Sequence, residues 1–377
     1  MIRDFTENIR RVLRLFESPN FVNQFSRGPH RTGCHANSDI VDNMTVVRKV
    51  KLLVTGASGY LGQHLLSSLV KDTSYDLTVA YGSLESFPHD CKNTFSKNDS
   101  TLKIVDGTVL DWSDESCVQA FFLEHTFDVI IHLAAISSPY RCEHDTDKTA
   151  SINCPTKFMS ALTQKDICER TKVIHLSTDQ IYDGFNAPYV EDDKASPVNF
   201  YGKSKLDFEQ LLLNADRAKI QPIILRSSLI LGGVTPGTCR KQSFLQFVKD
   251  RLLNQQETDF YSNEYRNVVF VGDVVKIIEF FVQCKDDISN PVFNMGGGDR
   301  VSRVEIAAEV AKVLELDPKY IKDTERAPMV PLNAPKHDDE IIVRSPPDIS
   351  MDIKKIQKVT GRTMLGLESI VRQSLKD

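Results

Sequence analysis

The chain has 377 residues, of which 41% are hydrophobic and 26% charged, and these values are ordinary for a globular protein. Its net charge of −5 gives no electrostatic basis for binding nucleic acid or an anionic membrane, and we expect neither as a partner. The apolar runs fall short of the about 20 residues that span a bilayer. Eight cysteines occur singly, without zinc-site spacing, so we expect no metal and reduced thiols in an intracellular compartment.

Residues 1–49 form an N-terminal extension in which apolar residues recur at helical spacing, with arginines among them. A basic amphipathic start is typical of organelle-targeting segments, but Asp4, Glu7 and Glu17 do not suit one, because transit peptides are poor in acidic residues. The alternative is a helix that docks on the domain or on a partner, in a homodimer or a protein complex. We expect a cytoplasmic protein, with a mitochondrial or other organellar location as the alternative.

From Lys51 onward, short apolar segments typical of buried strands alternate with helical patterns. The expected strands are Lys51–Thr55, Leu77–Tyr81, Leu102–Val105, Asp128–Leu133, Lys172–Leu176 and Pro222–Leu225. The expected helices are Glu115–His125, Thr149–Gln164, Lys203–Asn214, Arg303–Leu314 and Ile353–Val359. This order predicts an α/β fold, a doubly wound parallel sheet of the Rossmann type, over residues 50–227. We expect residues 228–377 to form mainly a smaller substrate-binding lobe, with some segments returning to the Rossmann core.

The first chemical motif is the glycine-rich turn Gly56–Gly62, between a predicted strand and a predicted helix. Gly56 permits a tight exit from the strand, Gly59 lets a pyrophosphate approach the backbone, and Gly62 lets the helix pack on the sheet. The helix N-terminus adds free N–H donors and a partial positive charge. We therefore predict that the turn binds NAD or NADP rather than only satisfying sharp geometry. The cofactor-binding residues expected in it are Gly56, Ser58, Gly59, Tyr60, Leu61 and Gly62.

The sequence slightly favours NADP over NAD. In NAD-preferring folds an acidic residue at the end of the second strand binds the ribose 2′-hydroxyl. Here Asp76 is expected before that strand, and the strand's end has neither an acidic residue nor an arginine. Ser83 is the residue that we expect to contact a 2′-phosphate.

A second motif pairs Tyr201 with Lys205, and spacing of four places both on one face of a helix. A neighbouring ammonium lowers the pKa of a phenol and can also hold the nicotinamide ribose. Such a pair is often only two surface residues, but here it follows a predicted strand that ends in Ser177 and Thr178. A hydroxyl at this strand end can orient a substrate carbonyl, and we choose Thr178, with Ser177 as the alternative.

Taken together, these motifs resemble the extended short-chain dehydrogenases, and within them the dTDP-4-dehydrorhamnose reductase branch. The family pattern S-T-D-Y-V-F-D-G corresponds to residues 177–184, and its Y-x-E-x-D-x-x-x-P-x-N-x-Y-G-x-S-K corresponds to residues 189–205. The similarity continues through residues 226–228, 266–274 and 294–297 to residues 344–353. It covers about residues 50–375 and is more specific for the family than for one reaction.

The resemblance implies a role for each matching residue. Tyr201 would protonate the carbonyl oxygen, Lys205 would be its partner and bind cofactor with it, and Thr178 would orient substrate. Other implied cofactor contacts are Leu133, Ala134 and Ala135, which follow the fourth strand; implied substrate contacts are Asp179, Gln180 and Arg266. Asn153 would support the active-site architecture. Glu143 matches an acidic position common in the branch, and a helix-start charge is the alternative for it.

Two departures affect the expected substrate. Gln180 stands where the branch has an aromatic residue, and Leu229 stands where it has tryptophan, both at substrate-contacting positions. The branch also contains a non-catalytic relative, the regulatory β subunit of methionine adenosyltransferase. The sequence therefore favours an NAD(P)-dependent reductase of a nucleotide-sugar-like carbonyl compound other than dTDP-4-dehydrorhamnose. The alternative is a cofactor-binding regulatory or accessory subunit of a larger complex.

Overall fold

A computed structural model describes residues 48–80, 103–105, 112, 114–164, 170–239, 242–329 and 343–375. Most of the N-terminal extension and Ser83 lie outside the described residues, so the expectations about them stay predictions. Within the described ranges, every helix is too short or too polar to cross a lipid bilayer.

The centre of the fold is a seven-stranded sheet in the order β11-β6-β5-β4-β1-β2-β3, with every neighbouring pair parallel. Its strands are β1 (Val50–Thr55), β2 (Tyr75–Ala80), β3 (Lys103–Val105), β4 (Val129–His132), β5 (Thr171–Thr178), β6 (Ile220–Ser227) and β11 (Val292–Met295). The predicted doubly wound parallel fold is confirmed. Strand order reverses between β1 and β4, and ligands of such sheets bind beyond the carboxyl ends of the strands at this point.

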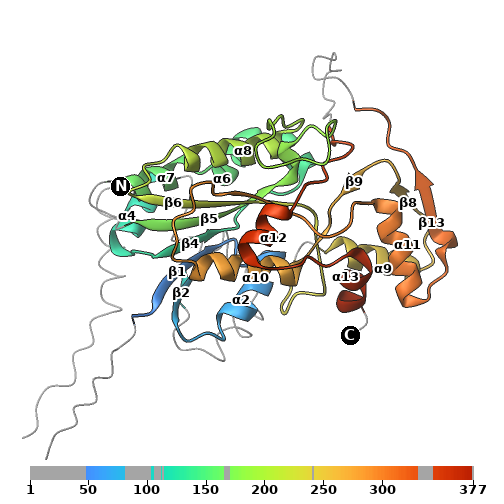
Figure 1. The fold of residues 1–377 in the computed structure, drawn as a ribbon, viewed down its shortest axis with the longest axis horizontal. Helices are drawn as coiled ribbons and strands as arrows, with labels where there is room; N and C mark the ends of the chain where they lie inside the picture. The colour runs from blue at the N-terminus through green and yellow to red at the C-terminus, as the bar shows by residue number, and fades with distance from the viewer. Residues whose placement is uncertain are drawn as a thin grey trace, which may run out of the picture. The chain divides into compact units, whose positions relative to one another are not determined.

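Helices cover both faces of the sheet (Figure 1). On one face α2 (Tyr60–Leu69) and α10 (Val271–Gln283) share a buried apolar core with the sheet. On the other, α4 (Glu115–Glu124), α7 (Thr156–Thr163) and α8 (Phe200–Leu213) share a second core. Strands buried on both faces explain why they read as continuous apolar runs in the sequence.

The single helix predicted over Thr149–Gln164 is wrong. Two helices, α6 (Thr146–Asn153) and α7, occupy this stretch, preceded by the short α5 (Pro139–His144). The break falls at Pro155, which has no backbone N–H to donate and clashes with a preceding helical turn. The kink places α6 against α8 (Phe200–Leu213).

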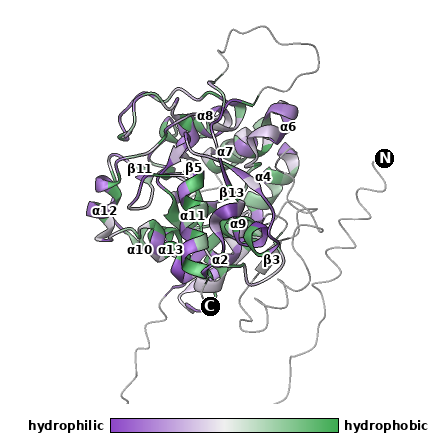
Figure 2. Cartoon of the chain, turned by 90° about the vertical axis from the view of Figure 1, so that its right-hand side faces the viewer, coloured by the Kyte–Doolittle hydropathy of each residue, from purple (hydrophilic) through white to green (hydrophobic). Residues whose placement is uncertain are grey.

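A second lobe follows β6, built on a third apolar core. Its elements are β7 (Ile230–Leu231), α9 (Phe244–Leu253), β8 (Thr258–Tyr261), β9 (Tyr265–Arg266), β10 (Val269–Phe270), β12 (Val301–Ser302), α11 (Arg303–Leu314), β13 (Ile321–Thr324) and α13 (Leu367–Leu375). Figure 2 shows green and purple segments alternating within these helices, as expected for amphipathic elements. A capping box of Ser302 and Glu305 fixes the start of α11. The chain also returns to the sheet through α10, β11 and α12 (Lys354–Thr360).

Candidate functional site

The three glycines of the turn meet different surroundings. Gly56 has φ +69°, and a Cβ there would lie 2.6 Å from the Ala134 nitrogen. A Cβ on Gly62 would lie 2.5 Å from the Gly56 carbonyl oxygen, whereas one on Gly59 would meet only that oxygen, at 3.2 Å. The fold itself therefore requires glycine at 56 and 62. Gly59 begins α2 without a side-chain cap, which leaves the helix N-terminus open to an anion.

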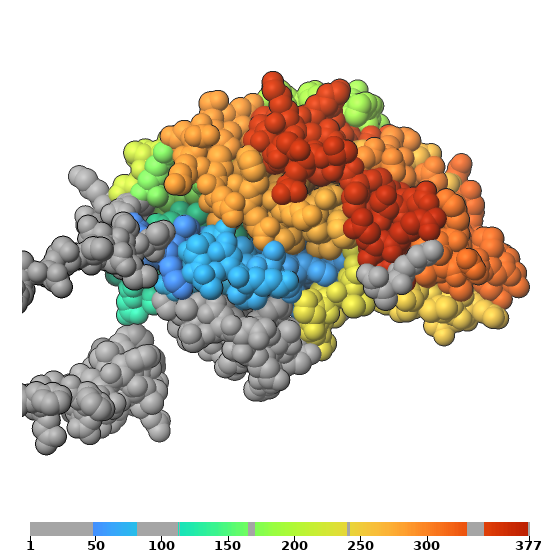
Figure 3. Space-filling model, turned by 60° about the horizontal axis from the view of Figure 1, so that its bottom comes forward, coloured from blue at the N-terminus to red at the C-terminus, as the bar shows by residue number. Residues whose placement is uncertain are grey.

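The turn is tied to a distant loop of the chain, at residues 232–239. The buried Gln63 side chain donates to the carbonyls of Ser58 and Thr238, each at 3.0 Å, and accepts from the Gly237 N–H at 3.0 Å. Tyr60 also donates to the Gly233 carbonyl at 2.9 Å. In Figure 3, yellow atoms of the chain after β7 lie against the blue surface of α2. Sequence reasoning missed this contact, because it joins residues more than 170 positions apart.

The segment that follows β4 is held by buried polar groups. The Thr55 hydroxyl accepts from the Ala134 N–H at 3.3 Å and bonds the His132 ring at 2.9 Å. Asn153 accepts from the N–H of Ile136 at 2.7 Å, donates to its carbonyl at 3.1 Å and donates to Ser204 at 2.9 Å. These contacts agree with the architectural role that was expected for Asn153. They also fix Leu133, Ala134 and Ala135 next to the glycine turn.

The structure brings Thr178 and Tyr201 together: Thr178 ends β5, Tyr201 lies in the first turn of α8, and their side chains are close enough to interact. Burial raises the pKa of the Tyr201 phenol, while the nearby Thr178 hydroxyl opposes this shift. The phenol is therefore protonated at neutral pH, which is the form that a proton donor needs. The lowered phenol pKa expected beside a lysine is absent here.

Lys205 lies one turn further along α8 and is only 1% exposed. Burial lowers the pKa of Lys205 to about 7, and the Glu209 carboxylate opposes that shift. Glu209 forms a buried ion pair with Arg226 at 2.9 Å and accepts a hydrogen bond from Ser177. This buried carboxylate, which sequence reasoning missed, ties α8 to the ends of β5 and β6.

The residues expected to bind substrate have different partners. Asp179 is 4% exposed; one carboxylate oxygen accepts from Thr178 at 3.2 Å, and the other has no hydrogen-bond partner among the described residues. Burial raises the pKa of Asp179, and the positive charges of Arg266 and Arg303 oppose this. Gln180 accepts from Asn199 at 2.8 Å. Arg266 donates to backbone carbonyls, including that of Pro346 at 2.9 Å, so its expected substrate contact stays a prediction.

Glu143 accepts a hydrogen bond from the Phe200 N–H at 2.8 Å. This contact docks α5 against the start of α8, beside Tyr201. The acidic side chain thus supports the start of α8 rather than the start of its own helix.

Comparison with known proteins identifies the class. The family described as "RmlD substrate binding domain" matches residues 50–376, and the chain belongs to this family. As the resemblance indicated, its relatives include a dTDP-4-dehydrorhamnose reductase and the β subunit of methionine adenosyltransferase 2.

Two relatives show the range of that family. Methionine adenosyltransferase 2 subunit beta of Mus musculus is 22% identical over 301 residues, which are 79% of this chain and 82% of the relative. The dTDP-4-dehydrorhamnose reductase of Aggregatibacter actinomycetemcomitans is 28% identical over 239 residues, which are 60% and 70% of the two chains. The family thus contains both an enzyme and a protein named as a subunit.

Solved structures share the fold. UDP-glucuronic acid 4-epimerase from Bacillus cereus, in complex with UDP-glucuronic acid and NAD, has a TM-score of 0.69 at 19% identity and covers 86% of this chain and 98% of its own. The dTDP-4-dehydrorhamnose reductase of Bacillus anthracis, in complex with NADP, has a TM-score of 0.64 at 18% identity, covering 86% and 96%.

Proposed function

We propose that this protein is an NAD(P)-dependent reductase of a nucleotide-sugar-like carbonyl compound. The observation that carries the proposal is the proximity of the Thr178 and Tyr201 side chains, with Lys205 one turn away, at the carboxyl edge of the sheet. The glycine turn opens at the same edge. The named ligands of the structural relatives, NAD or NADP and a UDP sugar, are in keeping with such a site.

In this mechanism the bound nicotinamide supplies the hydride. Thr178 donates a hydrogen bond to the substrate carbonyl and orients it. The protonated Tyr201 phenol gives its proton to the oxygen as negative charge develops there, and the Lys205 ammonium stabilises the resulting phenolate. Asn153 and Glu209 hold the surrounding backbone and the catalytic helix in place.

We expect NADP(H) to bind at least as well as NAD(H). Asp76 lies at the start of β2 rather than before it, and the strand ends at Ala80 without an acidic residue to hold a ribose 2′-hydroxyl. Paired calorimetric titrations with NADPH and NADH measure this preference. Tenfold tighter binding of NADH would contradict it.

Removal of the Tyr201 hydroxyl tests the reductase function. Tyr201→Phe should lose about 10²- to 10⁴-fold in turnover, the usual contribution of a positioned general acid. It should retain NADPH binding, because the turn around Gly59 holds the phosphates. Turnover is measured as NADPH oxidation with a panel of keto-sugar nucleotides. A wild-type protein that binds cofactor but reduces no member of the panel contradicts the proposal.

A second candidate function is a cofactor-binding subunit of a larger complex, because several relatives are named as the β subunit of methionine adenosyltransferase 2. In that case Tyr201→Phe should change neither assembly nor the partner's activity, whereas Gly59→Val should disturb both. Affinity purification of the full chain from its native cells, with turnover assayed on the same sample, distinguishes the two functions. A stoichiometric complex without turnover favours the subunit.

A further inference from the structure

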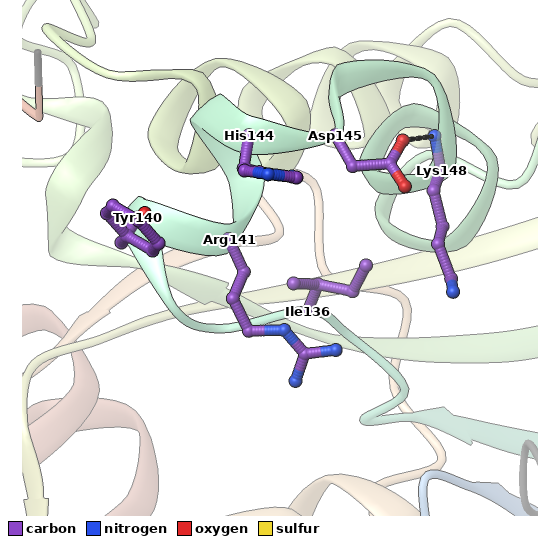
Figure 4. Close-up of a pocket in the computed structure, with 6 residues that line it drawn as sticks. All are labelled: Ile136, Tyr140, Arg141, His144, Asp145 and Lys148. Atoms are coloured by element: carbon purple, nitrogen blue, oxygen red, sulfur yellow. Dashed lines mark hydrogen bonds between the residues drawn. The ribbon is translucent and has the colours of Figure 1, made fainter. Parts of the chain in front are cut away.

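A cavity of about 310 Å³ opens beside α5 and the start of α6. It is lined by Ile136, Tyr140, Arg141, His144, Asp145 and Lys148. Figure 4 shows the Arg141 and Lys148 side chains extending in the same direction on either side of Ile136. Tyr140, 57% exposed, stands at one edge of the cavity. Most of these side chains have no part in the site described above.

The cavity has an excess of positive charge. Neither the Arg141 guanidinium nor the Lys148 ammonium forms a hydrogen bond or ion pair with the described residues. Asp145, the only carboxylate in the lining, accepts from the Lys148 backbone N–H at 3.0 Å and so caps α6. Two unpaired cations around a concave surface suit an oxyanion, since the planar guanidinium matches the geometry of a carboxylate or phosphate.

The cavity lies on the outer side of a helix that contacts the catalytic groups. Glu143 of α5 bonds the Phe200 N–H, and the Cys142 thiol donates to the Ile136 carbonyl at 3.2 Å. Cys142 is also close enough to Tyr201 and Lys205 to influence both electrostatically. Ile136 itself ends the segment that passes from β4 beside the glycine turn. An oxyanion in the cavity would therefore lie against a helix that also contacts the start of α8.

The sheet order indicates which molecule brings that oxyanion. The ribose 2′ position of a dinucleotide is expected beyond the end of β2. The cavity follows β4, on the other side of β1. The 2′-phosphate of a bound NADP would therefore lie away from Arg141. The substrate is the nearer source of an oxyanion for Arg141.

We propose that Arg141 and Lys148 form an oxyanion subsite that binds a phosphate or carboxylate of the carbonyl substrate, with the Tyr140 ring offering an apolar face beside it. The inference rests on the reductase function proposed above and makes Arg141 a specificity-determining residue. Substrates that lack a negative charge in this position bind weakly.

Calorimetric titration of NADP⁺-saturated protein with UDP-glucuronate, UDP-glucose and inorganic pyrophosphate tests the subsite. Arg141→Met should weaken binding by roughly tenfold or more, the effect of losing a hydrogen bond to a charged group, and Arg141→Lys should restore part of it. Arg170→Met is the matched control, because Arg170 is an arginine paired with Asp287 at the start of β5. It should leave all affinities unchanged.

The probes distinguish the two oxyanions. An equal loss for both UDP sugars and pyrophosphate assigns the subsite to the diphosphate, and a loss confined to UDP-glucuronate assigns it to the carboxylate. Failure of the wild type to bind any probe, or unchanged affinities in Arg141→Met, overturns the proposal. The proposal is also overturned if the only effect of Arg141→Met is a loss of affinity for NADPH relative to NADH. Arg141-dependent binding without any keto-sugar turnover would instead contradict the reductase function and leave the subsite standing.

Discussion

At the scale of single residues, the buried ammonium group of Lys205 carries a cost to stability. The Lys205 side chain is 1% exposed, so its ammonium group has lost its contact with water, and this burial lowers its pKa to about 7. The protein retains this group although an apolar side chain of similar length would stabilise the same space. A destabilising buried charge of this kind is expected at catalytic positions, where activity often comes with a loss of stability.

Lys205→Met should abolish turnover while raising the free energy of unfolding by a few kcal/mol, an order-of-magnitude conversion of the lysine's pKa shift. Below about pH 7 Lys205 is charged in both the folded and the unfolded chain, so the full cost of burying its charge lowers the free energy of unfolding. Between about pH 7 and 10.5 only the unfolded chain stays charged, and this cost falls steadily to zero as the pH rises. Urea unfolding at pH 6 and pH 9 measures this. A gain that is larger at pH 9 than at pH 6 would refute the account.

The residue scale also shows what the sequence can specify. Thr178 and Tyr201 were predicted to share a site from one strand end and one helical spacing, and the structure places them close together. Their roles, and that of Lys205, stay predictions. Glu209 was missed although it lies four residues after Lys205. Its role depends on Arg226 and Ser177, which reach it only when β5, β6 and α8 pack together.

At the scale of elements, α2 takes part in two contacts. Its N-terminus is where we expect the cofactor phosphates, and its Gln63 side chain is hydrogen-bonded to the loop at residues 232–239. The loop belongs to the chain that builds the second lobe. The Gln63 side chain therefore links this loop to the Ser58 carbonyl in the glycine turn.

Gln63→Leu should weaken NADPH binding by roughly three- to tenfold, because Gly237 and Thr238 lose buried hydrogen-bond partners worth about 1–3 kcal/mol each. It should lower the melting temperature as well. Ser67→Ala, one turn along the same helix, is the control and should change neither value. Calorimetry and thermal unfolding of the three proteins check this, and a Gln63→Leu protein with wild-type cofactor affinity would show that the loop contact is only structural.

The elements also show where pattern reading succeeds and fails. Periodicity located α11 at Arg303–Leu314 because its capping box and apolar stripe are local. The break before α7 was missed although Pro155 was visible, since apolar spacing on both sides of it imitates one continuous helix. Short strands such as β7 and β9 exist only through pairing with distant segments, and no local pattern predicts them.

At the scale of the whole molecule, the chain from Val47 to Asp377 forms one compact unit. Late segments complete the early sheet, because β11 pairs with β6 and α10 packs beside α2 in one apolar core. The glycine turn, α8 and the second lobe are thus parts of one compact unit. All three meet at the carboxyl edge of the sheet, where the proposed function requires a dinucleotide.

The most direct test of that claim is calorimetric titration of NADPH into wild-type and Gly59→Val protein. The surroundings of Gly59 tolerate a side chain with a small shift, since only the Gly56 carbonyl oxygen lies near, at 3.2 Å. Gly59→Val should therefore fold, with a circular dichroism spectrum like that of the wild type, and lose measurable NADPH binding because the side chain fills the pyrophosphate space. Unchanged NADPH affinity in the folded variant would contradict the account.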